Sequence, residues 1–269
     1  LLTRFLYYAL RPSLVQFQSM SIGAATQYLT KPILDNFKVG LPNLFVQEKI
    51  IDALSNYDDL IGNNRRRIQL LEESARLLYK EWFIHLRFPG HEHVEVIDGV
   101  PEGWESGSVI DFYNTSSGGT PSRKNLDFYT GEINWVKTGE LLDSFIFTTK
   151  EKVTEEAISK SSAKIFPSGS VLVAMYGATI GRTGILAHPS SSNQACCALI
   201  PNHELAHYSH AYLFLMENKA GLINLAKGAA QNNINQDIIK TYPMLMPPKL
   251  LMDIFYSSIN ESFDQIKNL

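Results

Sequence analysis

The chain has 269 residues, of which 45% are hydrophobic and 19% are charged. This balance is typical of a globular protein and argues against a disordered one, and the length allows one large domain or two ordinary ones. The net charge of −3 counts against simple electrostatic binding to nucleic acid, although a local cationic groove is enough to attract phosphates.

No apolar run approaches the roughly 20 residues that a membrane-spanning helix needs, and the chain does not open with the basic, apolar and small-residue order of a signal peptide. Cys196 and Cys197 are neighbours in an apolar run that predicts a strand. Neighbouring strand residues point to opposite faces, so we expect two buried thiols and no disulfide. We therefore expect a protein of the reducing cytoplasm.

Residues 1–42 begin an internal repeat. Shifted by 205 positions, the first 64 residues align with the last 64 without a gap. Tyr7 then aligns with Tyr212, and Pro42 aligns with Pro247. Similarity over such a length without a gap indicates a duplicated unit, and a repeat of this kind organises the fold of a chain.

The two copies have different surroundings in the sequence. A region of about 104–205 precedes the second copy and has no counterpart before Leu1. We therefore interpret residues 1–42 as the C-terminal part of a first domain, and we expect the chain to be a fragment with one complete unit between two partial ones. A natural circular permutation is the alternative.

Residues 43–88 are predicted to form a long spacer helix. Between Ile50 and Trp82 the apolar residues alternate at spacings of four and three, with Asn64 as the one polar residue of the series. A period of 3.5 is typical of a coiled coil, and about 40 helical residues give a rod of roughly 60 Å. We expect this rod to pack against the helix of the second copy, from Pro248 onward. A helix that packs along its own domain is the alternative.

Three consecutive cations, Arg65, Arg66 and Arg67, lie in the middle of this predicted helix. A solvated helix face is one interpretation of them. The other is a cationic patch that contacts phosphates or docks a partner subunit.

Residues 89–247 are predicted to form a globular unit, because short strands and turns replace the helical period. Strands are expected at 133–136, 170–176 and 195–200, a capped short helix at 154–158, and two helical stretches at 207–217 and 220–226. This pattern predicts the α+β class, with a mainly antiparallel, partly barrel-like sheet. Residues 248–269 repeat the start of the spacer and are expected to begin a second, truncated spacer helix.

Trp104, Gly-Gly-Thr-Pro-Ser at 118–122 and Trp-Val-Lys-Thr-Gly-Glu-Leu at 135–141 form a series of motifs in the first half of the globular unit. They resemble the opening of the target-recognition domain in type I restriction–modification specificity subunits. Its second half is similar to Pro-Ser-Gly-Ser-Val-Leu at 167–172, Met-Tyr-Gly-Ala-Thr-Ile-Gly at 175–181 and Asn-Gln-Ala-Cys-Cys-Ala at 193–198. Leu-Leu-Glu-Glu at 70–73, on the helix that ends with Trp82 and Phe83, resembles the spacer of the family. The resemblance covers essentially the whole chain in the family's order.

The resemblance implies a noncatalytic DNA-binding protein with a target-recognition domain at 89–247 and long coiled-coil spacer helices. Members of the family carry two recognition domains, each of which reads one half of a split, asymmetric DNA site, with the helices as a ruler. They assemble with methyltransferase (modification) subunits, and with restriction subunits in the complete enzyme. The expected partners are therefore double-stranded DNA, methyltransferase subunits docked on the helical spacer, and restriction subunits.

Candidate DNA-binding residues lie in the loops of the globular unit, since bases are read at their edges by side chains on a rigid scaffold. Arg and Lys suit guanine edges or phosphates, Asn and Gln suit adenine, and hydroxyl groups suit several partners. The candidates are Thr120, Ser122, Arg123, Lys124, Lys137, Thr138, Tyr176, Thr179, Arg182, Asn193, Gln194, Asn232 and Asn233.

Some of these candidates have a plainer interpretation. Arg123 and Lys124 are equally well explained as solvated charges. Asn232 and Asn233 suit a cap or turn before a strand expected near Ile238. Tyr176 would stack on a flipped base in a DNA complex, but an aromatic residue at a strand end is more often part of the core.

Catalytic motifs are missing from the sequence, which has neither a phosphate-binding P-loop nor the Asn-Pro-Pro-aromatic run of an amino-methyltransferase. His91-Glu92-His93 suggests a metal only weakly, so we expect no metal, no cofactor and no enzyme activity in the chain itself. The competing hypothesis is a coiled-coil assembly or adaptor protein whose globular unit binds a protein or a small ligand. The net acidity favours that alternative.

Overall fold

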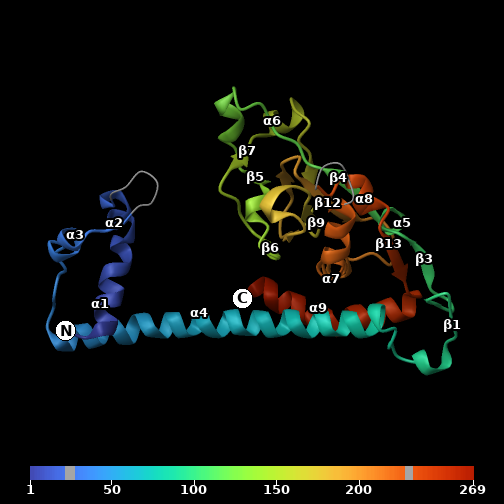
Figure 1. Cartoon of the computed structure of the whole chain (residues 1–269), viewed down its shortest axis with the longest axis horizontal. Helices are drawn as coiled ribbons and strands as arrows, with labels where there is room; N and C mark the ends of the chain where they lie inside the picture. Colours follow the sequence, from blue (N-terminus) through green and yellow to red (C-terminus); the bar gives the residue numbers. More distant parts are fainter. Residues whose placement is uncertain (22–27, 228–232) are drawn as a thin grey trace. The chain divides into compact units, whose positions relative to one another are not determined.

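The computed structural model of the protein describes residues 1–21, 28–227 and 233–269. The chain forms two compact units, Leu1–Gln69 and Leu70–Leu269, which are termed the N-terminal unit and the C-terminal unit (Figure 1). The candidate Asn232 lies outside the described residues.

The N-terminal unit is built from helices. They are α1 (Thr3–Leu10), η1 (Arg11–Ser13), α2 (Leu14–Met20), α3 (Lys31–Asp35) and the first part of α4 (Leu44–Tyr79). The Tyr8 hydroxyl donates to Asp58 Oδ2 over 2.7 Å, and Leu2 N donates to Gln47 Oε1 over 3.0 Å. These two hydrogen bonds tie the beginning of the chain to α4.

The predicted long helix is confirmed, because α4 continues without a break over 36 residues. Asn43 caps its start, with a side-chain oxygen that accepts from Val46 N over 3.0 Å. The α-helix ends at Tyr79 rather than at Trp82, and the chain continues as one π turn, η2 (Lys80–Ile84). The neighbours Trp82 and Phe83 are both buried, so the wider turn lies where the helix enters the core.

The C-terminal unit carries the strands. They are β1 (Val96–Ile97), β2 (Val100–Pro101), β3 (Glu105–Ser108), β4 (Tyr113–Ser117), β5 (Ile133–Val136), β6 (Ser144–Ile146), β7 (Lys152–Val153), β8 (Ile165–Phe166), β9 (Val171–Ala174), β10 (Thr183–Leu186), β11 (Ser190–Ser192), β12 (Cys196–Pro201) and β13 (Pro243–Met246). Between and after them lie η3 (His91–His93), α5 (Val109–Phe112), η4 (Leu126–Tyr129), η5 (Thr138–Glu140), α6 (Glu155–Ser159), η6 (Gly177–Thr179), α7 (Tyr208–Lys227), α8 (Gln236–Lys240) and α9 (Lys249–Asn268).

The largest sheet has the strand order β4-β12-β9-β10-β6, and a smaller sheet has the order β7-β5-β11-β8. Among the described strands, only β10 with β6 and β11 with β5 pair in parallel, and all other pairs are antiparallel. The predicted α+β fold with a mainly antiparallel sheet is therefore confirmed. The large sheet ends at β4 on one side and at β6 on the other, so the described strands form no closed barrel.

The central strands β9 and β12 are buried on both faces. Val171, Val173, Cys197 and Leu199 belong to one hydrophobic cluster. The alternate residues, among them Cys196, belong to a second cluster on the other face. The two thiols are free, and burial raises the pKa of each to about 12. The prediction of two buried, unlinked cysteines on opposite strand faces is confirmed.

Two local predictions after the sheet are wrong. Helix α7 is continuous, whereas two helical stretches, 207–217 and 220–226, were expected. The Asn218 side chain donates to Phe214 O, one turn earlier in the same helix, over 2.9 Å, so the helix continues through this polar residue. The strand expected near Ile238 is the short helix α8. The Asn235 side chain accepts from Ile238 N over 2.8 Å and so caps a helix at this point, and strand β13 follows it.

The duplicated unit is also present in the structure. Under the shift of 205 residues, α3 matches α8 and the start of α4 matches the start of α9, residue for residue. The stretch that matches α7 contains α1 and α2 with the turn η1 between them. The two copies therefore share the positions of their helices, as the repeat predicts, whereas the segment 38–41 that matches strand β13 forms no strand.

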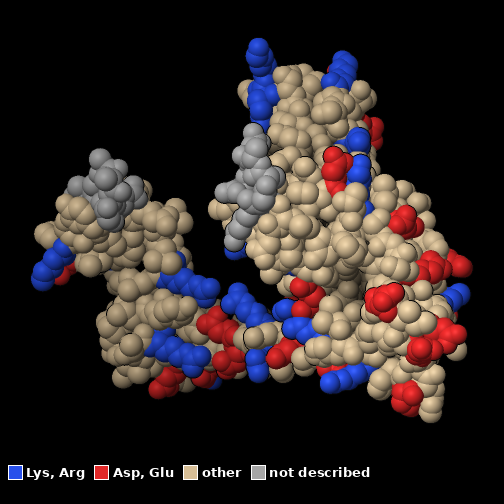
Figure 2. All heavy atoms as spheres, turned by 45° about the vertical axis from the view of Figure 1, so that its right-hand side comes forward, with Lys and Arg blue, Asp and Glu red and all other residues tan. Residues whose placement is uncertain are grey.

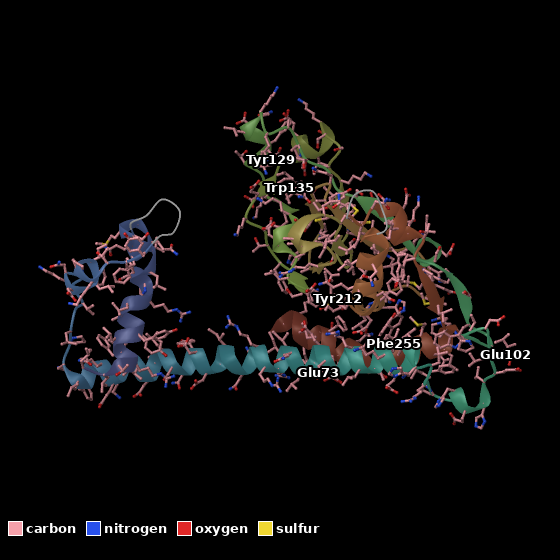
Figure 3. All side chains as sticks on the ribbon, viewed as in Figure 1. Glu73, Glu102, Tyr129, Trp135, Tyr212 and Phe255 are labelled. Carbon is pink, nitrogen blue, oxygen red and sulfur yellow. The ribbon has the colours of Figure 1, made fainter. Side chains whose placement is uncertain are left out.

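Helix α9 packs against the end of α4 within the C-terminal unit, as the repeat led us to expect. The two helices run in opposite directions there (Figure 1), and Phe255 of α9 lies among the rings near the end of α4 (Figure 3). Its ring centroid is 5.5 Å from that of Trp82 and 5.0 Å from that of Phe83. These aromatic contacts form the buried interface between the two helices.

An ion-pair cluster fixes α7 on the same stretch of α4. Glu217 of α7 is nearly buried, and its carboxylate lies 2.7 Å from Arg76 Nε and 3.2 Å from Lys80 Nζ. Helix α7 in turn lies against β9, β10 and β12. The sheet is thus connected rigidly to the end of the spacer helix through α7.

The buried His210 makes the stability of the C-terminal unit dependent on pH. Its Nδ1 lies 3.0 Å from the Tyr113 hydroxyl, and its ring packs beside Phe83 at 5.0 Å. Burial, with a smaller effect of the neighbouring His207, lowers the pKa of His210 to about 3. The folded protein therefore keeps this imidazole neutral over a range in which the unfolded chain protonates it.

We predict that stability falls as the pH is lowered from about 6.5 toward about 3, by up to about 1.4 kcal/mol for each pH unit. Urea unfolding at several pH values measures the slope, and His210→Phe should reduce it. The exposed His93→Gln serves as the control and should keep the wild-type slope. An unchanged slope in His210→Phe would contradict this assignment.

Candidate nucleic-acid interface

The first candidate loop, residues 118–124, is joined to the loop after β11 by the backbone. Gly118 N donates to Cys196 O over 3.2 Å, and Gly119 N donates to Ser192 O over 2.8 Å. A Cβ atom on Gly118 would lie 2.2 Å from Ser192 O, and one on Gly119 would lie 2.4 Å from Ala163 N. Only glycine fits at these two positions, which explains the Gly-Gly pair of the motif.

Two further loops are connected to the same place. Met175 N, at the end of β9, donates to Ala195 O over 2.8 Å. Ile234 N, in the segment before α8, donates to Met175 O over 3.1 Å. Backbone hydrogen bonds thus link four loops, which are termed the reading loops: 118–124, 175–182, 192–195 and 233–235.

The reading loops contain most of the predicted DNA-binding residues. Those in the described part of the chain are Thr120, Ser122, Arg123, Lys124, Tyr176, Thr179, Arg182, Asn193, Gln194 and Asn233. Lys137 and Thr138 lie next to them, directly after β5. The structure therefore brings together candidates that are far apart in the sequence.

Thr120 and Gln194 form one pair across two of these loops. The Thr120 hydroxyl donates to Gln194 Oε1, and both residues are exposed. The neighbouring Asn193 has a different role, because its Oδ1 accepts from Cys196 Sγ over 3.3 Å within its own turn. Gln194 is thus a candidate for base contact, whereas Asn193 shapes the loop.

Arg123 belongs to a compact aromatic and acidic cluster. Its guanidinium carbon lies 4.1 Å from the ring centroid of Tyr129 and 4.9 Å from that of Trp135. Its Nη2 lies 2.7 Å from one carboxylate oxygen of Glu151, and Lys137 Nζ lies 2.6 Å from the other. The hydrogen bond from Lys137 and the nearby guanidinium hold the pKa of the Glu151 carboxyl below its usual value. At neutral pH the cluster holds two cations and one carboxylate.

Other cations near the reading loops have no acidic partner. Lys124, Lys150 and Arg182 are exposed, and none of them forms an ion pair within the described ranges. Figure 2 shows Lys and Arg side chains that project from the end of the C-terminal unit where β7 and α6 lie. These charges are available to a polyanion despite the net acidity of the chain.

The three arginines at 65–67 lie on α4 in the N-terminal unit, and all are exposed. Arg66 Nη1 donates to Gln69 Oε1 over 2.9 Å, one turn further along the helix. Their position on a helix face leaves both interpretations open, a solvated face or a docking patch.

Sequence reasoning missed Tyr129, Trp135 and Glu151 as parts of the site. Trp135 was assigned to a strand, and its motif pointed to the family but not to Arg123. Glu151 is 28 residues from Arg123, and no periodicity links the two positions. Only the pairing of β5 with β7 brings this acidic residue toward the loop.

In the described part of the chain, no cluster of three or more His, Cys, Asp or Glu side chains has the arrangement of a metal site. Nor does any described helix have the length and hydropathy to cross a membrane.

The family model described as "Type I restriction modification DNA specificity domain" matches residues 1–73 and 101–250. The chain belongs to this family.

Three known proteins illustrate the similarity. The specificity subunit of the type I restriction enzyme MjaIX from Methanocaldococcus jannaschii is 22% identical over 277 residues, which cover 99% of this chain and 63% of that protein. The specificity subunit of the type I enzyme HindI from Haemophilus influenzae is 23% identical, over 88% of this chain and 65% of that protein. The crystal structure of the S subunit of a type I system from M. genitalium has a similar fold, with a TM-score of 0.59 and 12% identity over 98% of this chain and 68% of that one. The chain thus spans somewhat less than two thirds of the length of these two curated relatives.

We predict that Gly119→Ala destabilises the C-terminal unit by about 1–3 kcal/mol or more, because the added methyl group collides with the backbone at Ala163. Thermal unfolding measures the loss as a fall of several degrees in melting temperature. Gly139→Ala is the matched control, since nothing lies within 4 Å of its added Cβ. If both variants melt like the wild type, the loop is not held as described.

Proposed function

We propose that the protein is a noncatalytic DNA-recognition subunit of a type I restriction–modification complex, and that the C-terminal unit reads one half of a bipartite site in double-stranded DNA. The observation that carries the proposal is the convergence of four polar loops, two of which carry cations, beside one sheet. Bases are distinguished by such side chains at their edges, and phosphates are bound by nearby cations. The relatives are named specificity subunits, which favours this function over a coiled-coil adaptor.

Within this function, the DNA-binding residues would be Thr120, Ser122, Arg123, Lys124, Lys137, Thr138, Tyr176, Thr179, Arg182, Gln194 and Asn233, with Asn193 as support for its loop. Asn232, also predicted from the sequence, lies outside the described residues. Lys150 adds an exposed cation beside them.

We further propose that residues 1–42 are the C-terminal part of a first recognition domain, that 43–88 and 248–269 are spacer segments, and that 89–247 are a complete second recognition domain. Equivalent positions of the repeat support this division. Leu34 is 51% exposed, whereas its equivalent Ile239 is fully buried. Leu41 is 61% exposed, and its equivalent Met246 is fully buried. The N-terminal unit thus presents the apolar face that a sheet covers in the C-terminal unit.

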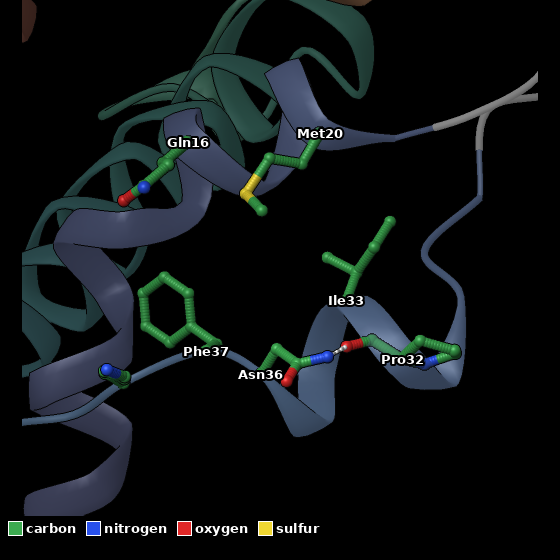
Figure 4. A pocket seen from close by; sticks show the side chains of 7 residues that line it. Gln16, Met20, Pro32, Ile33, Asn36 and Phe37 are labelled. Atoms are coloured by element: carbon green, nitrogen blue, oxygen red, sulfur yellow. Dashed lines mark hydrogen bonds between the residues drawn. The ribbon is translucent and has the colours of Figure 1, made fainter.

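The hollow between α2 and α3 supports the same interpretation. It has a volume of about 550 Å³ and is lined by residues that include Met20, Ile33 and Phe37 (Figure 4). In the C-terminal unit the equivalent of Phe37 is Tyr242, whose carbonyl accepts from Val109 N of α5 over 3.0 Å. A segment like α5 would fill the hollow if a second sheet region were joined to the N-terminal unit.

The partners that we propose are methyltransferase subunits docked on the helical spacer, with restriction subunits in the complete complex. The exposed arginines at 65–67 are candidates for the docking surface on α4. Such a complex would act in the cytoplasm, where its DNA is found. The helices would set the distance between two half-sites, since a helix has a fixed rise for each residue.

We predict that a randomised duplex pool, selected with the protein and its cognate methyltransferase subunit, becomes enriched in a bipartite motif with a fixed gap. The affinity should fall steeply as salt is raised, because phosphate contacts release counterions. The same selection without the methyltransferase subunit shows how much of the cationic surface the partner supplies. No enrichment in the presence of the partner would reject the function.

We also predict that Arg182→Ala weakens binding to cognate and unrelated duplexes by a similar factor and lowers the slope of log K against log salt by about one. The reason is that Arg182 is exposed on a reading loop without an ionic partner among the described residues, as expected for a phosphate contact. Lys249→Ala is the control, because its charge already pairs with Asp253 at 2.9 Å. Unchanged affinity in Arg182→Ala would remove this residue from the interface.

A further inference from the structure

The guanidinium of Arg123 is held on three sides. The rings of Tyr129 and Trp135 lie 4.1 Å and 4.9 Å from its carbon, and Glu151 lies 2.7 Å from its Nη2. Tyr129 and Trp135 meet edge to face, with centroids 5.7 Å apart (Figure 3). Even so, the side chain of Arg123 remains 52% exposed. The side chain therefore remains accessible to a ligand.

The groups that hold Arg123 are fixed to the framework themselves. Trp135 Nε1 donates to Gly119 O over 3.0 Å, and the Tyr129 hydroxyl donates to Pro121 O over 2.7 Å. Both acceptors belong to the reading loop that carries Arg123.

The backbone of Glu151 is fixed as well, since its carbonyl accepts from Trp135 N over 3.2 Å and from the Thr149 hydroxyl over 2.6 Å. The loop and the aromatic rings thus form one hydrogen-bonded assembly, and the carboxylate is joined to it by the backbone of Glu151 and by its ion pairs with Arg123 and Lys137. An arginine in such a setting loses little conformational freedom when it binds.

The charge of the assembly separates two possible ligands. A phosphate is attracted by net positive charge, and the Glu151 carboxylate compensates one of the two cations, Arg123 and Lys137, so the assembly attracts a phosphate less strongly than two free cations would. Hydrogen bonds from Arg123 to a ligand are affected less, because the remaining N–H donors of the planar guanidinium keep their geometry. The group in DNA that matches two parallel donors without a full negative charge is the O6 and N7 edge of guanine in the major groove.

We propose that Glu151 is a positioning residue that holds Arg123, against Tyr129 and Trp135, for the recognition of one guanine in the half-site. The proposal rests on the DNA-recognition function proposed above. It adds the base that is recognised, guanine, and the residue that orients the arginine that binds it. Lys137, bound to the other oxygen of Glu151 at 2.6 Å, prevents rotation of the carboxylate. Removal of the carboxylate frees the guanidinium and leaves its charge uncompensated, so selectivity falls while general affinity for DNA is kept or rises.

The test uses the protein as cells make it, assembled with its methyltransferase subunit, and a duplex pool with a randomised core. The wild type should select a motif that contains one guanine sensitive to Arg123. Arg123→Lys keeps the charge but loses the fork, and should reduce the preference for that guanine roughly tenfold or more. Glu151→Gln should reduce the preference at the same position and at no other, while binding to unrelated duplexes is equal or tighter.

Glu132→Gln is the matched control. Glu132 pairs with Lys152 over 2.8 Å beside the same small sheet and forms no ion pair with Arg123 among the described residues. Glu132→Gln therefore changes the net charge by the same amount as Glu151→Gln, and it should leave every base preference intact. Thermal unfolding of each variant checks that the fold persists, and Arg123→Lys keeps the proposal testable if Glu151→Gln is unstable.

The outcomes separate the two levels of the proposal. A wild type that selects no motif overturns the DNA-recognition function and this inference with it. A wild-type motif that Glu151→Gln keeps at every position overturns the positioning role alone. If Arg123→Lys lowers affinity equally for all sequences, or not at all, the guanine assignment is wrong.

Discussion

The close approach between the backbone at Gly118-Gly119 and the loop after β11 is the constraint on which the proposed reading surface depends. Gly118 lies against Ser192 without room for a Cβ atom, and Gly119 lies in the same way against Ala163. Both glycine N–H groups donate to backbone carbonyls on either side of the loop after β11, those of Ser192 and Cys196. The carbonyl of Gly119 also accepts a hydrogen bond from the indole N–H of Trp135. The ring of Trp135 packs against the guanidinium of Arg123. A glycine pair thus determines where the polar side chains of the first loop lie relative to the sheet.

The rigidity of this surface extends to the spacer helix through packed and paired side chains. The sheet packs under α7, α7 is bound to the end of α4 by Glu217, and α9 closes the seam with Phe255. Each connection lies within the C-terminal unit, so the sheet and the adjoining stretch of α4 belong to one compact unit. This connection is what a protein needs if the spacing between two half-sites is to be set by the length of a helix.

Features with a local signal could be predicted from the sequence. The apolar four–three alternation predicted α4, the run Ile133–Val136 predicted β5 with the same bounds, and the ungapped repeat predicted that α9 begins like α4. Features that depend on distant partners could not. The Arg123–Glu151 pair spans 28 residues, and nothing around either residue indicates the other. Near Ile238 the sequence predicts a strand, and the structure has the helix α8 instead, because the Asn235 side chain caps a helix at this point.

The central claim is that the four reading loops together contact DNA. Hydrogen–deuterium exchange of the assembled complex, with and without its selected duplex, tests it most directly. The account predicts that DNA slows amide exchange in 118–124, 175–182, 192–195 and 233–235, while the β1–β2 hairpin at 96–101 exchanges as before. Unchanged exchange in these four segments, with slower exchange elsewhere in the C-terminal unit, would contradict it.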